Sequence, residues 1–216
     1  MRLVLHDYWR SGAAYRVRIA LNLKGLAFER RVVDLRAGGQ ATPDYLALNP
    51  QGLVPALEAD GVVLTQSGAI LEWLEETFPA PPLLPLDARS RAVVRAMADI
   101  VGRDIHPLNN LRVQKELRGP IGASQAEVQA WIARWVTAGF TALEALIAQH
   151  GGAFAFGDAP TLADCHLVPQ VYSARRFEVD LEGFPHIRRV EAAAAALAAF
   201  AAAHPNAQAD AEAGQG

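Results

Sequence analysis

The chain has 216 residues, of which 51% are hydrophobic and 20% charged, and its formal net charge at pH 7 is −3. A chain of this length can bury a substantial core without a metal or a disulfide. Its 20 basic and 23 acidic residues are nearly balanced, so no basic field exists for nucleic acid or anionic lipid. We therefore expect neither nucleic acid nor a membrane as a partner, and a small neutral or anionic ligand instead.

Cys165 is the one cysteine in the sequence, which excludes an intramolecular disulfide and a thiolate metal cluster. The histidines show no metal-binding spacing, so we expect no metal. The sequence begins without the long apolar core of a signal peptide, and no apolar run reaches membrane-spanning length. A single cysteine fits a reducing compartment, and we expect a cytoplasmic protein.

The first part of the chain predicts alternating strands and helices. Hydrophobic patterning predicts strands over residues 3–8 and 28–35, helices over 13–24 and 43–48, and a hairpin formed by 54–58 and 62–65. Ser67 is expected to cap a third helix, with Glu72, Glu75 and Glu76 facing water. The order β-α-β-α-β-β-α is that of a thioredoxin-like domain, which we place at residues 1–84.

A proline-rich stretch separates this domain from the rest of the chain. Residues 79–85 contain four prolines and cannot continue a helix, so we expect a linker over residues 79–87. Helical patterns follow over 88–117, 124–150, 161–177 and 185–203, with capping boxes opened by Ser124 and Thr161. The sequence therefore predicts an all-α domain over residues 88–216, in which the low-complexity tail, 206–216, is disordered.

Three motifs in the first domain can hold an anion or a peptide backbone. Arg10-Ser11 lies where the first strand gives way to a helix, Val54-Pro55 enters a strand, and Gln66-Ser67 opens a helix. Helix N-termini bind anions, and the backbone at a strand end can pair with an extended peptide.

The two predicted halves, the proline linker and these motifs together resemble a glutathione transferase over nearly the whole chain. The chain resembles the zeta class in particular. The residues that carry this resemblance are Arg10-Ser11 followed by residues 16–21, Asn49-Pro50, Gln66-Ser67, and the segments 168–171, 176–177 and 179–181. That class includes maleylacetoacetate and maleylpyruvate isomerases. The resemblance implies the glutathione transferase fold, a homodimer, and glutathione as cofactor.

The resemblance makes Ser11 the catalytic residue, donating a hydrogen bond to the glutathione sulfur. A thiol of pKa about 8.5 is only about 3% thiolate at pH 7, and lowering that pKa by about two units takes roughly 2.7 kcal/mol. The thiolate adds to the double bond of a cis maleyl group, the resulting single bond rotates, and elimination releases the trans fumaryl isomer. The zeta pattern usually reads Ser-Ser-Cys where this chain has Ser11-Gly12-Ala13, so a second hydroxyl and a thiol are absent beside Ser11.

The resemblance also implies binding residues. The cofactor would be held by Val54 and Pro55 through a cis peptide, by Gln66 and Ser67 at the γ-glutamyl carboxylate, by Gln40 at the glycyl end, and by His106 and Asn110. The last two lie four residues apart, hence on one face of a long helix that Pro107 should bend, and would line a cleft between domains. The substrate is a small dicarboxylate, which calls for arginine forks from Arg10, Arg112 and Arg176.

Each of these residues also has a purely structural interpretation. Ser11 could be only a helix cap, His106 an ordinary helix-face histidine, and the three arginines solvated charges. Arg16 and Arg18 are expected to pair with carboxylates such as those of the glutamate-rich third helix.

Three functions therefore stay open: a glutathione-dependent isomerase of a maleyl keto acid in aromatic-compound catabolism, a transferase that conjugates or dehalogenates small electrophiles, and a non-catalytic protein on the same fold. The three arginines favour the isomerase, because a transferase acting on hydrophobic substrates would not need them.

Overall fold

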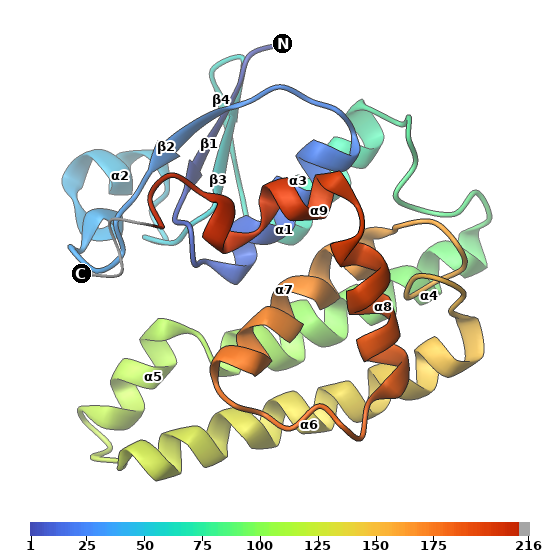
Figure 1. Ribbon diagram of the computed structural model, residues 1–216. Helices are drawn as coiled ribbons and strands as arrows, with labels where there is room; N and C mark the ends of the chain where they lie inside the picture. The colour runs from blue at the N-terminus through green and yellow to red at the C-terminus, as the bar shows by residue number, and fades with distance from the viewer. Residues whose placement is uncertain (212–216) are drawn as a thin grey trace. The chain divides into compact units, whose positions relative to one another are not determined.

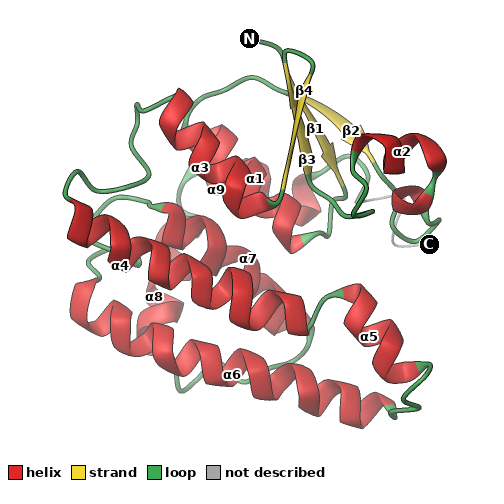
Figure 2. Cartoon of the chain, turned by 180° about the vertical axis from the view of Figure 1, so that it is seen from behind, coloured by secondary structure: helices red, strands yellow, loops and turns green. Residues whose placement is uncertain are grey.

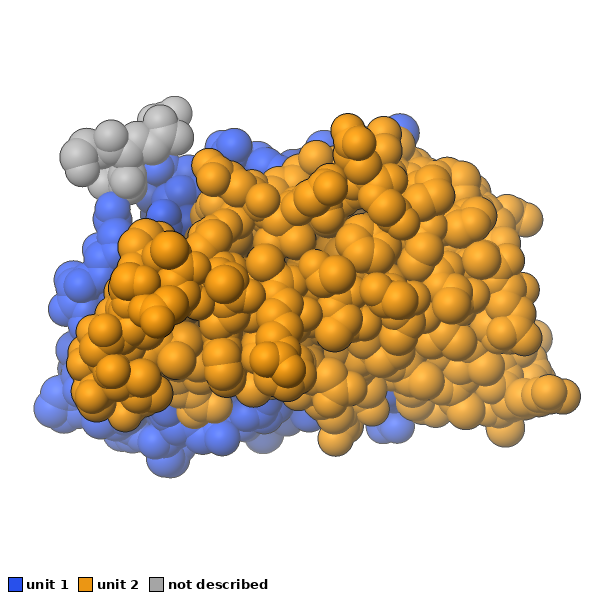
Figure 3. Space-filling view, turned by 90° about the horizontal axis from the view of Figure 1, so that it is seen from below, with its two compact units in different colours: residues 1–83, 195–216 blue, residues 84–194 orange. Residues whose placement is uncertain are grey.

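The computed structural model describes residues 1–211, and its contacts divide the chain into two compact units. The sheet unit comprises Met1–Leu83 together with the residues from Ala195 onward, and the helical unit comprises Leu84–Ala194. Figure 3 colours the two units separately.

The sheet unit begins with alternating strands and helices, as the sequence predicts. In chain order its elements are β1 (Leu3–Asp7), α1 (Gly12–Leu23), β2 (Glu29–Val32), a 3₁₀ turn (Gly39–Ala41), α2 (Pro43–Leu48), β3 (Ala56–Ala59), β4 (Val62–Thr65) and α3 (Ser67–Thr77). The sheet order is β2-β1-β3-β4, with β2 parallel to β1 and the other pairs antiparallel. In Figures 1 and 2, α1 and α3 lie on one face of the sheet and α2 on the other. The predicted thioredoxin-like order is confirmed.

Left-handed backbone conformations end two of these elements at the predicted places. Gly25, directly after the C-cap Lys24 of α1, has φ +65°. Asp60 and Gly61 join β3 to β4 with φ +45° and +88°, the pair of positive φ values that a tight hairpin turn requires. Both turns therefore follow from glycine and aspartate at positions where other residues would be strained.

One glutamate of α3 faces the interior, contrary to the prediction. Glu75 is 6% exposed and accepts hydrogen bonds from Lys24 Nζ at 2.7 Å and from the Leu83 N–H at 2.9 Å. Lys24 also donates to the carbonyl oxygens of Phe78 and Pro81. This buried ion pair joins the end of α1 to the end of α3 and to the proline-rich stretch that follows. The glutamate-rich sequence of α3 does not indicate this contact.

The prediction of one continuous helix for the last segment is wrong. The expected helix over 185–203 is two helices, α8 (Pro185–Ala195) and α9 (Ala198–Ala203), and α9 packs on α1 in the sheet unit. Arg18 Nε donates to the Ala203 carbonyl oxygen at 2.9 Å, and Asn22 Nδ2 donates to that of Ala199 at 3.0 Å. Polar side chains of α1 thus hold the alanine-rich segment, whose own sequence gives no indication of this contact.

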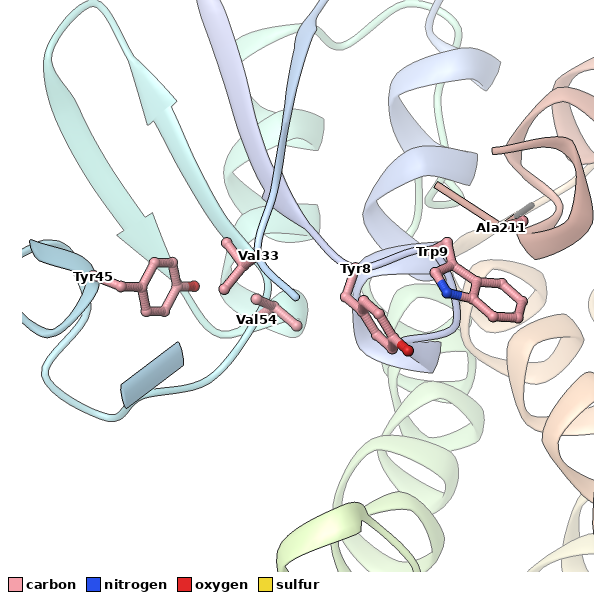
Figure 4. Close-up of a cluster of buried hydrophobic side chains, with 6 residues drawn as sticks. All are labelled: Tyr8, Trp9, Val33, Tyr45, Val54 and Ala211. Atoms are coloured by element: carbon pink, nitrogen blue, oxygen red, sulfur yellow. The ribbon is translucent and has the colours of Figure 1, made fainter. Parts of the chain in front are cut away.

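The expectation of a disordered tail over 206–216 is also wrong for its described part. Residues 205–207 form a 3₁₀ turn, and Asp210 accepts hydrogen bonds from the Trp9 backbone N–H and from Arg30, both at 3.0 Å. Ala211 is buried, and Figure 4 shows it beside the Trp9 side chain. Residues 212–216 lie outside the described part of the chain.

Arg30 links this tail to a buried charged cluster at the end of β1. Asp7 is fully buried and accepts hydrogen bonds from Arg18 Nη1 at 2.7 and 2.9 Å and from Arg30 Nε at 2.7 Å. The expectation that Arg18 pairs with a carboxylate is confirmed, and its partner is Asp7 of β1 in place of a glutamate of the third helix. The cluster ties β1, β2, α1 and the tail to one another.

The helical unit contains α4 (Ala88–Asp99), a π-helical turn (Ile100–Ile105), a 3₁₀ turn (His106–Leu108), α5 (Leu111–Arg118), α6 (Gln125–His150), α7 (Leu162–Arg176) and most of α8. The predicted capping boxes of Ser124 and Thr161 are both formed. The single helix expected over 88–117 is wrong: the chain breaks around Pro107, which lacks the N–H that a continuous helix needs. Within residues 1–211, no helix has both the length and the apolar character to cross a membrane.

Asp164 closes the second capping box from a fully buried position. Its carboxylate accepts hydrogen bonds from the Ala155 N–H at 2.8 Å, the Thr161 N–H at 2.7 Å and the Thr161 hydroxyl at 3.0 Å. Burial raises the pKa of Asp164 to about 6, against these hydrogen bonds, which lower it. The folded protein thus binds a proton at this site more tightly than the unfolded chain does.

The Asp210 contact predicts a cost for removing its side chain. Asp210→Ala leaves the Trp9 N–H and Arg30 Nη2 without their acceptor. We therefore expect the free energy of unfolding, measured by chemical denaturation, to fall by about 1–3 kcal/mol. Asp99→Ala, which breaks an exposed pair with Arg103, is the control and should cost less than about 0.5 kcal/mol. Equal effects of the two variants would contradict the described tail contact.

The raised pKa of Asp164 predicts a definite pH dependence. Because its folded-state pKa exceeds its unfolded value of about 3.9, the stabilisation from protonating this group is complete at low pH and lost as pH rises through about 6. The free energy of unfolding of the native chain, minus that of Asp164→Asn, should fall by about 2 kcal/mol between pH 4 and pH 7. Urea titrations at several pH values measure this difference. A flat or rising difference for Asp164→Asn would contradict the assignment.

Candidate active site

The strand register brings three candidate segments to one end of the sheet. His6 of β1 lies opposite Ala56 at the start of β3, and Ala56 lies opposite Thr65 at the end of β4. The chain therefore leaves β1, enters β3 and leaves β4 at the same edge. Ser11, Val54-Pro55 and Gln66-Ser67 occupy the turns immediately outside these three strand ends.

Ser11 is the N-cap of α1 and retains a proton to donate. Its backbone is extended, with φ −69° and ψ 117°, and its Oγ accepts a hydrogen bond from the Ala14 N–H at 3.2 Å. A hydroxyl has two acceptor lone pairs and one donor proton, so capping uses only a lone pair. The half-buried hydroxyl stands at the positive end of a helix that spans Gly12–Leu23. The structural interpretation as a cap is confirmed, and the cap is compatible with donation to an anion.

The Val54-Pro55 peptide bond is cis, as the resemblance implied, and the loop before it is held firmly. The Leu53 carbonyl oxygen accepts hydrogen bonds from the Tyr45 hydroxyl and from Asn49 Nδ2, both at 2.7 Å. Burial raises the pKa of Tyr45 to about 12, so this hydroxyl stays a donor at neutral pH. Figure 4 shows Tyr45, Val33 and Val54 in the buried cluster that also contains Tyr8 and Trp9.

Gln66 and Ser67 depart from the predicted capping arrangement. Gln66 is the N-cap of α3 and has φ +68°, a conformation that costs energy for any residue except glycine. Its side chain donates to Gln51 Oε1 at 2.7 Å and does not cap the helix. Ser67 is the first helical residue, not the cap, and its Oγ accepts a hydrogen bond from Arg16 Nη1 at 3.2 Å.

Arg16 is a residue whose position the sequence interpretation missed. It was expected to pair with carboxylates, but it is 3% exposed and no ion pair with it is found within residues 1–211. Residues 14–21 of α1 are all buried, so no periodic pattern separates its polar positions from its apolar ones.

The two further candidates of the sheet unit are Gln40 and Arg10. Gln40 is half-buried in the 3₁₀ turn. A Cβ built on Gly52 would lie 3.1 Å from the Gln40 carbonyl oxygen, so this turn packs against the segment leading to Val54. Arg10 is exposed, with its guanidinium carbon 5.4 Å from the centre of the Trp9 ring. Arg10 thus directly precedes Ser11, and the turn that contains Gln40 packs against the segment before Pro55.

The four remaining candidates belong to the helical unit. The prediction that His106 and Asn110 share one helix face is wrong, because His106 begins the 3₁₀ turn and Asn110 is the extended N-cap of α5. Asn110 Oδ1 accepts a hydrogen bond from the Val113 N–H at 3.2 Å. Arg112 is exposed in the first turn of α5, and Arg176 is the exposed last residue of α7, 4.4 Å above the Phe177 ring.

The structure therefore brings seven of the candidates together within the sheet unit: Arg10, Ser11, Gln40, Val54, Pro55, Gln66 and Ser67. Within residues 1–211, no group of three or more His, Cys, Asp or Glu side chains could hold a metal ion. Cys165 is fully buried in α7. The chemistry available at the strand ends is thus hydrogen-bond donation and anion binding at two helix N-termini.

Comparison with known proteins assigns the chain to a family. The glutathione S-transferase N-terminal domain model matches residues 10–77, and the C-terminal domain model of the same family matches residues 129–209. A maleylpyruvate isomerase of Ralstonia sp is 54% identical over 95% of this chain and 98% of that protein.

Two solved structures are similar over almost their full length. One is a holo maleylpyruvate isomerase described as a bacterial zeta-class glutathione S-transferase, with a TM-score of 0.94 and 54% identity over 96% of this chain and 99% of the other. The second is maleylacetoacetate isomerase from Anaeromyxobacter dehalogenans 2CP-1 with glutathione bound in its active site, with a TM-score of 0.88 and 50% identity over 97% of this chain and 98% of the other. The chain belongs to the glutathione S-transferase family and, within it, to the zeta class.

Proposed function

We propose that this chain is a glutathione-dependent cis-trans isomerase that converts a maleyl keto acid, maleylpyruvate or maleylacetoacetate, to its fumaryl isomer in the breakdown of aromatic compounds. The names of its relatives support the reaction. The observation that carries the proposal is the position of Ser11, a hydroxyl that caps α1 with a lone pair and keeps its proton for a ligand.

The catalytic role of Ser11 is to stabilise the glutathione thiolate. A hydrogen bond to a charged acceptor contributes about 1.5–3 kcal/mol, which is the amount needed to lower a thiol pKa by about one to two units. The positive end of α1 acts in the same direction. A moderate decrease suits this reaction, because a thiolate of very low pKa is a poor nucleophile.

The reaction regenerates the thiolate. Its sulfur forms a bond to one carbon of the cis double bond, and the π electrons move onto the neighbouring carboxyl or keto group as an enolate. Rotation about the new single bond follows, and the enolate electrons then re-form the double bond in the trans geometry as the carbon-sulfur bond breaks. Glutathione is therefore a cofactor and is not consumed.

The remaining candidates hold the two ligands. The Val54 backbone, placed by the cis peptide bond to Pro55, pairs with the cysteinyl part of glutathione. Gln66 and Ser67 bind the γ-glutamyl carboxylate, and Gln40, His106 and Asn110 complete the cofactor site. Arg10, Arg112 and Arg176 bind the substrate carboxylates, for which exposed guanidinium groups are suited. The enzyme is a cytoplasmic homodimer in this proposal; the zeta-class resemblance supports the dimer, and a lone, buried cysteine fits a reducing compartment.

Removing the Ser11 hydroxyl should slow isomerisation. We expect Ser11→Ala to lower kcat/KM about 10- to 100-fold at pH 7, because the thiolate loses a charged hydrogen bond. The decrease should shrink toward high pH, where the thiol ionises without help. Ser11→Thr keeps both the cap and the donor and is the control. An Ser11→Ala enzyme with native turnover, folded by circular dichroism, would refute the role of Ser11.

The arginines distinguish the isomerase from a transferase of small electrophiles. Arg10→Gln and Arg176→Gln should each lower kcat/KM for maleylpyruvate or maleylacetoacetate at least about 10-fold. Glutathione conjugation of a neutral chlorinated aromatic should change less than about 2-fold, because no carboxylate is recognised. Arg134→Gln, a substitution on α6, is the control. Native activity without turnover of either keto acid would favour the transferase instead.

A further inference from the structure

Arg16 carries a buried charge that nothing in the described protein compensates. Its side chain is inside the sheet unit, and its one hydrogen bond within residues 1–211 is from Nη1 to Ser67 Oγ at 3.2 Å. Its Nε is buried without a partner in the same part of the chain. A buried guanidinium without a carboxylate is costly, so its presence calls for a reason.

Arg18, two residues further along the same helix, is a buried arginine whose charge is compensated by a carboxylate. It donates to both oxygens of Asp7 and to the carbonyl oxygens of Trp9 and Ala203. Burial lowers the pKa of Arg16 to about 10, and no nearby carboxylate opposes this effect. The two arginines thus share a helix and the same degree of burial, but only Arg18 has an anionic partner.

The one partner of Arg16 stands at an open helix N-terminus. Ser67 is the first residue of α3, and the N-cap Gln66 supplies no side-chain acceptor to the first turn. Gln66, Gly68 and Ala69 are exposed, and a Cβ built on Gly68 would meet no atom within 4 Å. The N–H groups of this turn and the Ser67 hydroxyl therefore face a place where an anion can enter, with the Arg16 charge directly behind.

We propose that Arg16 is a positioning residue for glutathione: its hydrogen bond to Ser67 Oγ turns the Ser67 hydroxyl proton toward the γ-glutamyl carboxylate, whose charge in turn compensates the buried guanidinium. This inference rests on the proposed function for the identity of the ligand. It deepens that proposal by assigning affinity for one carboxylate of glutathione to a side chain that does not touch it.

The geometry has two consequences that a purely structural arginine would not have. Replacing Arg16 with methionine removes an uncompensated buried charge, so the ligand-free protein should be as stable as the native protein or more stable. The same replacement should weaken glutathione binding, because Ser67 loses its orienting donor and the carboxylate loses its counter-charge. A structural role would instead lower stability and leave carboxylate recognition unchanged.

The test measures binding of two ligands to Arg16→Met by titration calorimetry, without substrate. The ligands are glutathione and 4-aminobutyryl-cysteinylglycine, which is the same tripeptide with hydrogen in place of the γ-glutamyl carboxylate. We expect the Kd for glutathione to rise about 10- to 100-fold and the Kd for the analogue to change less than about 2-fold. Thermal unfolding of the ligand-free protein should show no decrease in Tm.

Two further variants keep the inference falsifiable if Arg16→Met does not fold. Arg16→Lys retains a buried cation and should retain most of the preference for glutathione over the analogue. Arg18→Lys is the matched control in the same helix; it should alter Tm and leave the ratio of the two Kd values unchanged. Equal losses of affinity for both ligands in the Arg16 variants, or no loss for either, would overturn the inference.

The isomerase assay on the same samples separates this inference from the proposed function. If the native protein binds glutathione in an Arg16-dependent way but turns over neither keto acid, the proposed function fails and the role of Arg16 stands. If the native protein isomerises a keto acid and Arg16→Met binds both ligands normally, the role of Arg16 fails alone.

Discussion

The pairing of β3 with β1 on one side and β4 on the other is the constraint on which the candidate site depends. Because both pairs are antiparallel, the start of β3 lies between the ends of β1 and β4. The turns that follow or precede these strands therefore meet at one edge, whatever their sequences. A register shift of one residue would move every side chain of β3 to the other face, and the fully buried Ala56 and Leu57 oppose such a shift.

Buried ion pairs hold the elements of the sheet unit to one another. Asp7 joins Arg18 and Arg30, and Lys24 joins Glu75, so α1, α3, two strands and the tail are tied together by paired charges. Arg16 is also buried, but within residues 1–211 it has no carboxylate partner and donates a hydrogen bond to Ser67 Oγ. If the proposed role of Arg16 holds, helix α1 serves two purposes: its paired charges hold the fold, and Arg16 supports the binding of glutathione.

Local patterns were enough to predict most elements of the sheet unit and the cap of its first helix. The hairpin follows from Asp60 and Gly61, and the cap of α1 follows from the place of Ser11 between a strand and a helix. What could not be predicted depends on partners distant in sequence. Glu75 looks like a surface glutamate until Lys24 is placed beside it, and the alanine-rich α9 gives no indication that Arg18 and Asn22 will hold it.

The most direct test of the account is the pKa of the glutathione thiol bound to the protein, followed by ultraviolet absorbance of the thiolate as pH is raised. A hydrogen bond from Ser11 predicts a pKa about one to two units below that of free glutathione for the native protein. In Ser11→Ala the value should return most of the way to that of the free tripeptide, while Ser11→Thr keeps the decrease. A bound thiol with the same pKa in the native protein and in Ser11→Ala would contradict the central claim.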